Sequence, residues 1–481
     1  MPTQSDMSLS AMSWLVSACC AGIMCWILAC LDKQEADRCV IALAIGWAMA
    51  AVLSAMIGSW QFLGLAPQPH PLIASSAQHE VYANLRQRNQ LATLLMMGAM
   101  ILLWFCQNKA GVWRVITWTA LTLVICCLAA TASRTGFVQL IALSLMILRL
   151  RQHLAQRLPR HLIAMLVIYA LALVALPWLS RLLALGGGGL LSRLDDSNAF
   201  SRLALWSNVL DLIAQKPWTG HGWRSLAYAH YSTEFSGARF MELLDNAHNL
   251  PLHLAVELGL PVALSFCGFV IWAVWRAKPW LESQPDRQMA WGILLVIGIH
   301  SMVEYPLWYG PFFLTALLCS MILCADVWKK WLFAGTQYRK NAIILGVRGL
   351  AISLLACTTF AAIDYHRASQ IYLQPQERSS WYADDALGAA QRSVLFKSHA
   401  KFAELVITPL SRETAPRVLE LSSELVIWSP EPRVIEKLIE SSVMMGLDDL
   451  AAFHLKRYRV AYPQAYATWA AQAQKSITSV L

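Results

Sequence analysis

The most regular pattern in this chain is a series of apolar runs, most of them close to 20 residues long, separated by short polar stretches. A helix of about 20 apolar residues matches the roughly 30 Å hydrocarbon core of a bilayer and satisfies its own backbone groups there. The pattern therefore predicts an all-α polytopic membrane protein. We place about ten transmembrane helices, at residues 12–31, 40–64, 91–107, 113–131, 134–150, 162–180, 250–275, 289–303, 311–328 and 343–363.

Basic residues gather in alternate loops between these runs, and this sets the expected orientation. The residues concerned are Lys33 and Arg38; Lys109 and Arg114; Arg149, Arg151, Arg157 and Arg160; Arg276, Lys278 and Arg287; and Lys329, Lys330, Arg339 and Lys340. Lys and Arg are retained in cytoplasmic loops, so we expect these loops in the cytoplasm. Both termini, the segments 65–90 and 181–249, and everything after about residue 364 are then expected outside.

The composition agrees with a membrane protein and argues against a nucleic-acid partner. The 481 residues are 57% hydrophobic and 14% charged, and the mean hydropathy is +0.47. A net charge of +9 would suggest nucleic-acid binding in a soluble protein, but here the cytoplasmic loops account for it. The first apolar run lacks a basic region before it and a small-residue cleavage site after it. We interpret it as a retained helix and not as a cleaved signal peptide.

The alternation of apolar and polar segments predicts four regions. These are N-terminal transmembrane helices (1–180), an external loop subdomain (181–249), C-terminal transmembrane helices (250–363) and an external helical domain (364–481). The run Gly186–Gly189 is typical of a hinge, and Ser201 to Gln215 has helical periodicity. The tail is amphipathic and broken by prolines, on the scale of tetratricopeptide-like helix pairs, although no clear repeat signature is present.

The cysteines and histidines do not predict a metal centre. All 12 cysteines lie in or beside apolar runs and no CxxC occurs, so we expect neither a disulfide framework nor a zinc site. His300 and Glu304 are i,i+4 neighbours that could join His248 in a metal site. Their spacing matches no established ligand set, so we expect no metal and no cofactor.

Several polar side chains fall where the chain is expected to leave the membrane on its outer side. Arg134 lies in TASRTG and Arg202 on the periodic external segment, and guanidinium groups suit bidentate binding of phosphate oxygens. The alternative is pairing with a nearby acid, or reaching to lipid headgroups as Arg86 and Arg88 more commonly would. His248 is either a general base for a hydroxyl or a residue that merely caps a helix.

Three further residues follow from the same inspection. His253 and Glu257 are expected to face inward on the span 250–275 and to satisfy each other or backbone groups. The stretch HSMVEYPLWYG, which contains Glu304, is expected to face the same compartment as His248.

Taken in order, SRTG, RLALWSNVLDLIAQKPWTGHGW and AHNLPLHLAVELGLP resemble the O-antigen ligase/polymerase superfamily. ANLRQRNQLA, HSMVEYPLWYG and the helical tail are more similar to the PglL-type protein O-oligosaccharyltransferases. The resemblance covers about residues 80–480. It implies a multi-pass protein of the bacterial inner membrane with a periplasmic active site. It also implies that an undecaprenyl-diphosphate-linked oligosaccharide is the donor and that Ser or Thr of an exported, pilin-like protein is the acceptor.

The resemblance also implies roles for individual residues. His248 matches the family's essential histidine, and Arg134 and Arg202 match arginines that hold the donor diphosphate. Asn249 would orient that histidine or cap the helix. Glu304 and Tyr305 match the EYP element and are assigned to substrate binding. The family leads us to expect about twelve spans, yet only two precede ANLRQRNQ. Either the N-terminus is shortened or this is a reduced member, and in both cases the outer wall of the lipid groove is expected to differ from the family's.

Other functions remain open at this stage. Within the same chemistry, the acceptor is either lipid A-core, which defines an O-antigen ligase, or a growing O-antigen chain, which defines a polymerase. A lipid or solute transporter is disfavoured because no inverted repeat is apparent. A docking protein whose working part is the helical tail is the remaining class.

Overall fold

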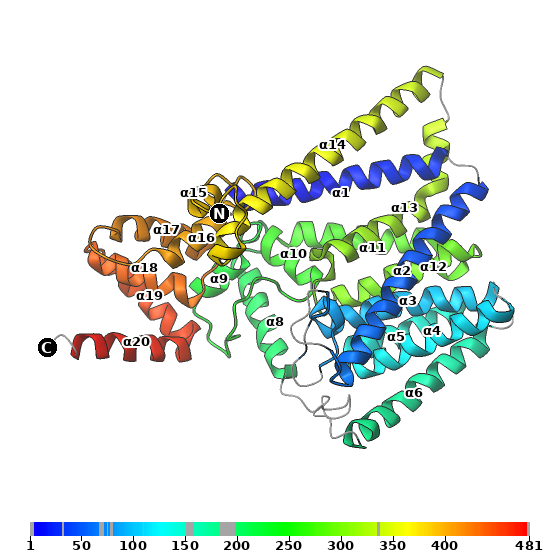
Figure 1. Ribbon diagram of the computed structural model, residues 1–481, viewed down its shortest axis with the longest axis horizontal. Helices are drawn as coiled ribbons and strands as arrows, with labels where there is room; N and C mark the ends of the chain where they lie inside the picture. Colours follow the sequence, from blue (N-terminus) through cyan, green and yellow to red (C-terminus); the bar gives the residue numbers. More distant parts are fainter. Residues whose placement is uncertain are drawn as a thin grey trace.

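A computed structural model of the chain describes residues 4–30, 33–66, 72–74, 76, 80–108, 110–150, 158–182, 198–333 and 337–478. Every regular element in these ranges is a helix, which confirms the all-α prediction. The run Gly186–Gly189 lies outside the described residues. Each of the ten predicted spans is helical over most of its described residues (Figure 1).

The helices of the apolar part are long and mostly match the predicted spans. They are α1 (Gln4–Cys30), α2 (Lys33–Phe62), α3 (Arg88–Asn108), α4 (Gly111–Ala130), α5 (Arg134–Leu150), α6 (Leu158–Leu182), α11 (Leu260–Ala277), α12 (Pro285–Ser301), α13 (Gly310–Phe333) and α14 (Gln337–Ser369). Seven helices among the described residues are long and apolar enough to cross a membrane. The chain is therefore a multi-pass membrane protein. α5 and α12, with 17 residues each, are shorter than those seven.

One predicted span is wrong in extent. Residues 250–275 do not form a single helix, because the chain breaks at Gly259 into α10 (Leu250–Leu258) and α11. Gly259 has φ +88°, and a Cβ there would lie 2.3 Å from the backbone oxygen of Trp218. The turn after α8 therefore packs against the break, with Leu260 N donating to Pro217 O at 2.8 Å. Hydropathy does not register such a break, and the candidate membrane span begins only at Leu260.

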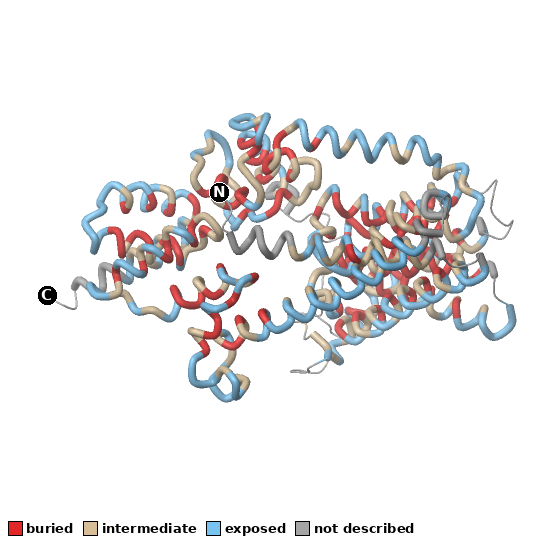
Figure 2. The backbone as a smooth tube through the Cα atoms, turned by 90° about the horizontal axis from the view of Figure 1, so that it is seen from above, coloured by how far each residue is buried: buried red, intermediate tan, exposed pale blue. Residues whose placement is uncertain are grey.

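The helix α3 forms the centre of the apolar bundle. It packs against α2, α4, α5 and α12, and most of its apolar window is buried. Figure 2 shows the buried backbone concentrated there and in the C-terminal helices, whereas α14 is exposed along most of its length. The position of the first residues of α3 is therefore fixed by the helices that surround it.

The remaining α-helices lie at one end of the molecule (Figure 1). They are α8 (Asn198–Gln215), α9 (Leu226–Ser232), α15 (Ala386–Gln391), α16 (Lys397–Ile407), α17 (Ala415–Trp428), α18 (Pro432–Met444), α19 (Asp448–Ala461) and α20 (Pro463–Thr478). Short 3₁₀ turns connect the helices: η2 (Ala83–Leu85), η3 (Pro279–Leu281), η4 (Pro306–Trp308), η5 (Gln370–Tyr372) and η6 (Pro375–Glu377). The N-terminal end of α1 lies beside α15 and α16 (Figure 1).

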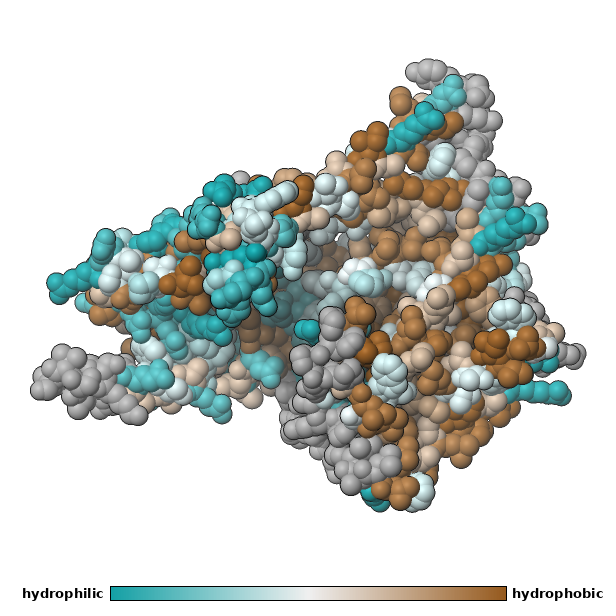
Figure 3. All heavy atoms as spheres, viewed as in Figure 1, coloured by the Kyte–Doolittle hydropathy of each residue, from teal (hydrophilic) through white to brown (hydrophobic). Residues whose placement is uncertain are grey.

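The C-terminal helices stack in sequence and attach to the segment that precedes the site. α17, α18 and α19 pack on one another as neighbours, which is the helix-pair arrangement that the amphipathic pattern indicates. Tyr231 on α9 joins their core, and its hydroxyl lies 3.1 Å from His454 Nδ1 on α19. Figure 3 shows hydrophilic side chains over this lobe and hydrophobic ones over the membrane helices.

Candidate active site

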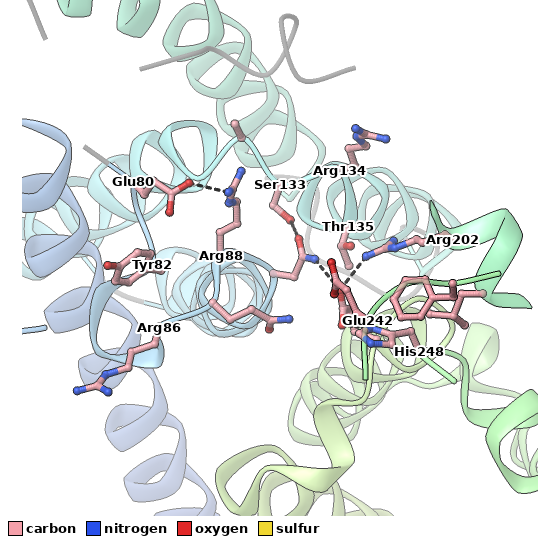
Figure 4. A pocket seen from close by; sticks show the side chains of 16 residues that line it. Glu80, Tyr82, Arg86, Arg88, Ser133, Arg134, Thr135, Arg202, Glu242 and His248 are labelled. Atoms are coloured by element: carbon pink, nitrogen blue, oxygen red, sulfur yellow. Dashed lines mark hydrogen bonds and ion pairs between the residues drawn. The ribbon is translucent and has the colours of Figure 1, made fainter. Parts of the chain in front are cut away.

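A polar cavity of about 470 Å³ opens where the outer ends of α3 and α5 meet α8 and the segments before α10 and after α12. Its lining includes one histidine, His248, and the acidic and basic residues Glu80, Arg86, Arg88, Arg134, Arg202, Glu242 and Glu304 (Figure 4). The structure thus brings Arg134, Arg202 and His248, predicted from three separate segments, to one cavity.

Glu304 stands at the centre of the site, between two of the predicted residues. Its Oε1 accepts from Arg202 Nη2 at 2.7 Å, and its Oε2 lies 2.8 Å from His248 Nδ1. The carboxylate is buried, and burial alone would raise its pKa. The hydrogen bond with His248 and the positive charge of Arg202 outweigh burial, so the pKa of Glu304 is lowered. The group is therefore a fixed anion that holds both partners.

His248 is presented to the cavity by a strained backbone. Its φ is +49°, in the left-handed region that side chains rarely adopt, and its N–H donates to Asn246 Oδ1 at 3.0 Å. Its ring meets the ring of Tyr305 edge-on at 4.9 Å. A neutral imidazole that donates Nδ1–H to Glu304 keeps Nε2 as an acceptor, which is the form that a general base requires.

Asn249 caps the helix that follows. Its Oδ1 accepts from Leu252 N at 3.0 Å, so the capping alternative is confirmed, and its Nδ2 donates to Met302 O at 3.0 Å. The second bond ties the start of α10 to the loop that carries Glu304. Asn249 therefore fixes the distance between the two segments whose side chains meet.

The two arginines are placed differently. Arg134 is the first residue of α5 and is exposed, whereas Arg202 on α8 is held by Glu304. In Figure 4 their guanidinium groups do not point toward each other. Of the alternatives for Arg202, pairing with a nearby acid is the one that the structure shows, because Glu304 binds it. Arg88, expected at lipid headgroups, instead lines the cavity and pairs with Glu80 at 2.9 Å.

Sequence reasoning missed the polar residues that support this cluster. Ser133 Oγ donates to Asn89 Oδ1 at 2.7 Å, and Asn89 Nδ2 approaches Glu304 Oε1 at 3.3 Å. Beneath them, His300 Nδ1 lies 2.9 Å from Thr93 Oγ1. The sequence feature that could have revealed these residues is their position as polar side chains at the ends of apolar helices.

His300 is thereby fixed deep under the site rather than beside His248. In the described ranges, no group of three His, Cys, Asp or Glu side chains is arranged to hold a metal ion.

His253 and Glu257 on α10 face inward, as the sequence suggested. Their Nε2 and Oε2 atoms are 3.5 Å apart and both side chains are buried. Burial lowers the pKa of His253 to about 3 and raises that of Glu257 to about 7, so the pair is largely neutral. Ala247 N also approaches His253 Nδ1, at 3.4 Å. The pair therefore supports the residue before His248.

Family comparisons match three parts of the chain. A family described as "O-Antigen ligase" matches residues 119–267, which include Arg134, Arg202 and His248. One described as "Virulence factor membrane-bound polymerase, C-terminal" matches residues 288–476, from α12 to α20. "Protein glycosylation ligase" matches residues 81–105. The fold is that of a multi-pass membrane protein, and these matches support its resemblance to the O-antigen ligase superfamily.

Two curated proteins are similar in sequence to this chain. The chain is 28% identical to the "General O-oligosaccharyltransferase" of Acinetobacter baylyi over 301 residues, which cover 59% of the chain and 51% of that protein. It is 21% identical to the "ComP-specific O-oligosaccharyltransferase" of the same organism, covering 69% of the chain and 56% of that protein. The matches thus span about half the length of these relatives. These similarities support the resemblance to the PglL-type branch of the superfamily.

Proposed function

We propose that this protein is a glycosyltransferase that moves an oligosaccharide from an undecaprenyl-diphosphate carrier to a Ser or Thr hydroxyl of an exported protein such as a pilin. The reaction takes place at the periplasmic face of the bacterial inner membrane. The observation that carries the proposal is the meeting of His248, Glu304 and Arg202 in a cavity that Arg134 also lines. The names of the two relatives support protein as the acceptor.

The reaction divides among these side chains. The acceptor oxygen attacks the anomeric carbon, and its proton passes to Nε2 of His248. The bond between that carbon and the phosphate oxygen breaks, and undecaprenyl diphosphate leaves with the electron pair. Arg134 and Arg202 stabilise the charge on the departing diphosphate, which is where electrostatic help lowers the barrier most. The side chains that line the cavity complete this sequence without a cofactor.

Glu304 acts through its partners in this scheme. Its carboxylate fixes the Nδ1–H form of His248 and so turns Nε2 toward the acceptor. It also keeps Arg202 extended into the cavity before the donor arrives. We therefore assign Glu304 a positioning role and not the direct substrate contact that the sequence suggested. Tyr305 packs against the His248 ring and restricts its rotation.

The decisive experiment is His248→Ala, assayed with purified protein, lipid-linked oligosaccharide and purified pilin. We expect transfer to fall by at least a hundredfold, within the range for loss of a general base, with normal membrane insertion. His221→Ala is the control, because that ring binds the backbone oxygen of Leu212 away from the cavity. Full transfer by His248→Ala would remove the general-base role.

A sugar hydroxyl is a second candidate for the acceptor. Two of the matching families are described by O-antigen ligation and by a membrane-bound polymerase, which favours a sugar hydroxyl as acceptor. The same His248 and arginines would serve that chemistry. Parallel assays with pilin, lipid A-core and O-antigen acceptors decide between them, because product on lipid A-core alone would exclude the pilin assignment.

A further inference from the structure

The cavity extends beyond the cluster around Glu304. In Figure 4, Glu80, Tyr82, Arg86 and Arg88 lie on the side opposite Arg202, Glu242 and His248. The volume of about 470 Å³ falls in the range of sites that take a whole small molecule. The proposed chemistry uses only the His248 end, so the far end has no assigned ligand.

The wall at this far end is built before any ligand binds. Gln61 on α2 is buried, and its Oε1 accepts from the backbone N–H groups of Tyr82 and Ala83 at 3.1 and 2.7 Å. Its Nε2 donates to Ala83 O and Ala74 O at 3.3 and 2.9 Å. One side chain from a membrane helix therefore fixes the turn that carries Tyr82. A preorganised wall of this kind lowers the entropy cost of binding.

The chemistry of this end suits an uncharged polar ligand better than the lipid diphosphate of the donor. The Arg88 guanidinium is already engaged by the Glu80 carboxylate, and the lining of charged and polar groups does not suit a polyprenyl chain. Arg88 Nη2 and Glu80 Oε1 form an ion pair at 2.9 Å, and each side chain is about one-third exposed to the cavity and solvent, at 35% and 38%. Such a pair offers both donors and acceptors to an uncharged, hydroxyl-rich ligand, and the Tyr82 ring offers an apolar face.

We infer that Glu80, Tyr82 and Arg88 form a subsite for the glycan of the donor, holding sugars beyond the one that is transferred from the diphosphate. The inference rests on the proposed function and names the part of the substrate that this end recognises. Asn89 connects the two ends, because it follows Arg88 in the chain and bonds to both Ser133 and Glu304. Glycan binding at Arg88 would thus lie one residue from Asn89, which contacts Glu304.

The test compares donors that share one lipid diphosphate and carry one, two or more sugars. In the wild type, the donor KM should fall as the glycan lengthens. In Glu80→Gln/Arg88→Met, the KM of the longest donor should rise about fivefold to tenfold, as expected for one or two lost hydrogen bonds, and the increase should shrink with each sugar removed. The matched control is Asp385→Asn/Arg392→Met, an exposed pair at 3.6 Å on the C-terminal lobe.

A second measurement keeps the inference testable if the double variant folds poorly. Free oligosaccharide, released from the donor and added as a competitor, should inhibit the wild type and inhibit Tyr82→Ala at least threefold less. Free monosaccharide should not distinguish the two proteins.

Three results would overturn the subsite. The first is an equal KM increase for all donors together with lower thermal stability, which makes Glu80–Arg88 a structural pair. The second is a raised acceptor KM at every glycan length, which places the acceptor there. The third is no change at all. His248→Ala is measured in parallel. If His248→Ala is active, the proposed function itself fails. If His248→Ala is inactive and Glu80→Gln/Arg88→Met shows no dependence on glycan length, only the subsite fails.

Discussion

At the scale of single residues, the site depends on one carboxylate that serves two partners. Glu304 binds His248 with one oxygen and Arg202 with the other, and its lowered pKa keeps it ionised at neutral pH. Removing either partner would leave a buried anion less well compensated, which is costly. These two contacts are the reason for the positioning role that we propose for Glu304.

Glu304→Gln separates these two roles. Glutamine keeps the shape but loses the charge, so we expect kcat to fall roughly tenfold to a hundredfold while the donor KM stays unchanged or decreases, because Arg202 is released. Steady-state kinetics with varied donor measure both constants. Glu242→Gln, a carboxylate in the same cavity, is the control. A large increase in donor KM with unchanged kcat would instead make Glu304 a substrate ligand.

Arg134→Lys tests whether the fork of a guanidinium is needed at the start of α5. Lysine retains the charge but cannot make two parallel bonds to a phosphate, so we expect the donor KM to rise about tenfold with an unchanged melting temperature. Arg134→Met is the companion variant and should lose more. Equal donor use by wild type and both variants would leave Arg134 as a headgroup contact.

At the scale of elements, the break between α10 and α11 determines where His248 lies. Gly259 lets the turn after α8 approach α10, and His221 N and Gly222 N donate to the backbone oxygens of Val256 and Glu257 at 2.8 and 2.9 Å. The same turn also contacts the end of α8, the helix that carries Arg202. The break therefore fixes α8 relative to the helix that follows His248.

Gly259→Ala should be strongly destabilising. Its φ of +88° strains any side chain, and the added Cβ would lie 2.3 Å from the Trp218 oxygen, so we expect a loss of about 2–4 kcal/mol. Thermal unfolding in detergent measures it. Gly268→Ala on α11, where nothing lies within 4 Å of the added Cβ, should be neutral or slightly stabilising. Equal melting temperatures for the two variants would contradict the close approach.

At the scale of the whole molecule, the outer lobe is attached to the site through α9. The buried contact between Tyr231 and His454, together with the bond from Arg457 Nε to Ser232 O at 3.0 Å, joins α19 to the segment that leads to Glu242 and His248. One family match runs from α12 to α20, so it includes membrane helices and the C-terminal lobe together.

Stability as a function of pH should reveal the buried carboxyl on α10. Burial raises the pKa of Glu257 from 4.5 to about 7, so the folded state holds its proton more tightly than the unfolded state does. The resulting stabilisation is complete below pH 4.5 and is lost as pH rises to about 7, by at most about 3 kcal/mol.

Glu257→Gln should remove this pH dependence and leave the protein more stable than the wild type at pH 8. Melting temperatures between pH 4.5 and 8 provide the measurement. A difference in melting temperature between the wild type and Glu257→Gln that stays constant from pH 4.5 to 8 would contradict a raised pKa of Glu257.

The sequence by itself determined the membrane helices and most of the candidate residues. Hydrophobic length is a local property, and a charged or imidazole side chain at the end of an apolar run is unusual in any fold. Arg134, Arg202 and His248 could therefore be singled out one at a time. Capping by Asn249 could be named as one of two alternatives because a cap involves only the next three residues.

Only the tertiary structure decided which of these groups meet. Glu304 lies 56 residues from His248 and 102 from Arg202, and it reaches both because Gly259 breaks a helix and Asn249 ties two loops together. Ion pairs between distant segments leave no periodic trace in the sequence, since they depend on how the helices pack. For the same reason, the wall that Gln61 holds in place at the far end of the cavity could not be predicted from the sequence.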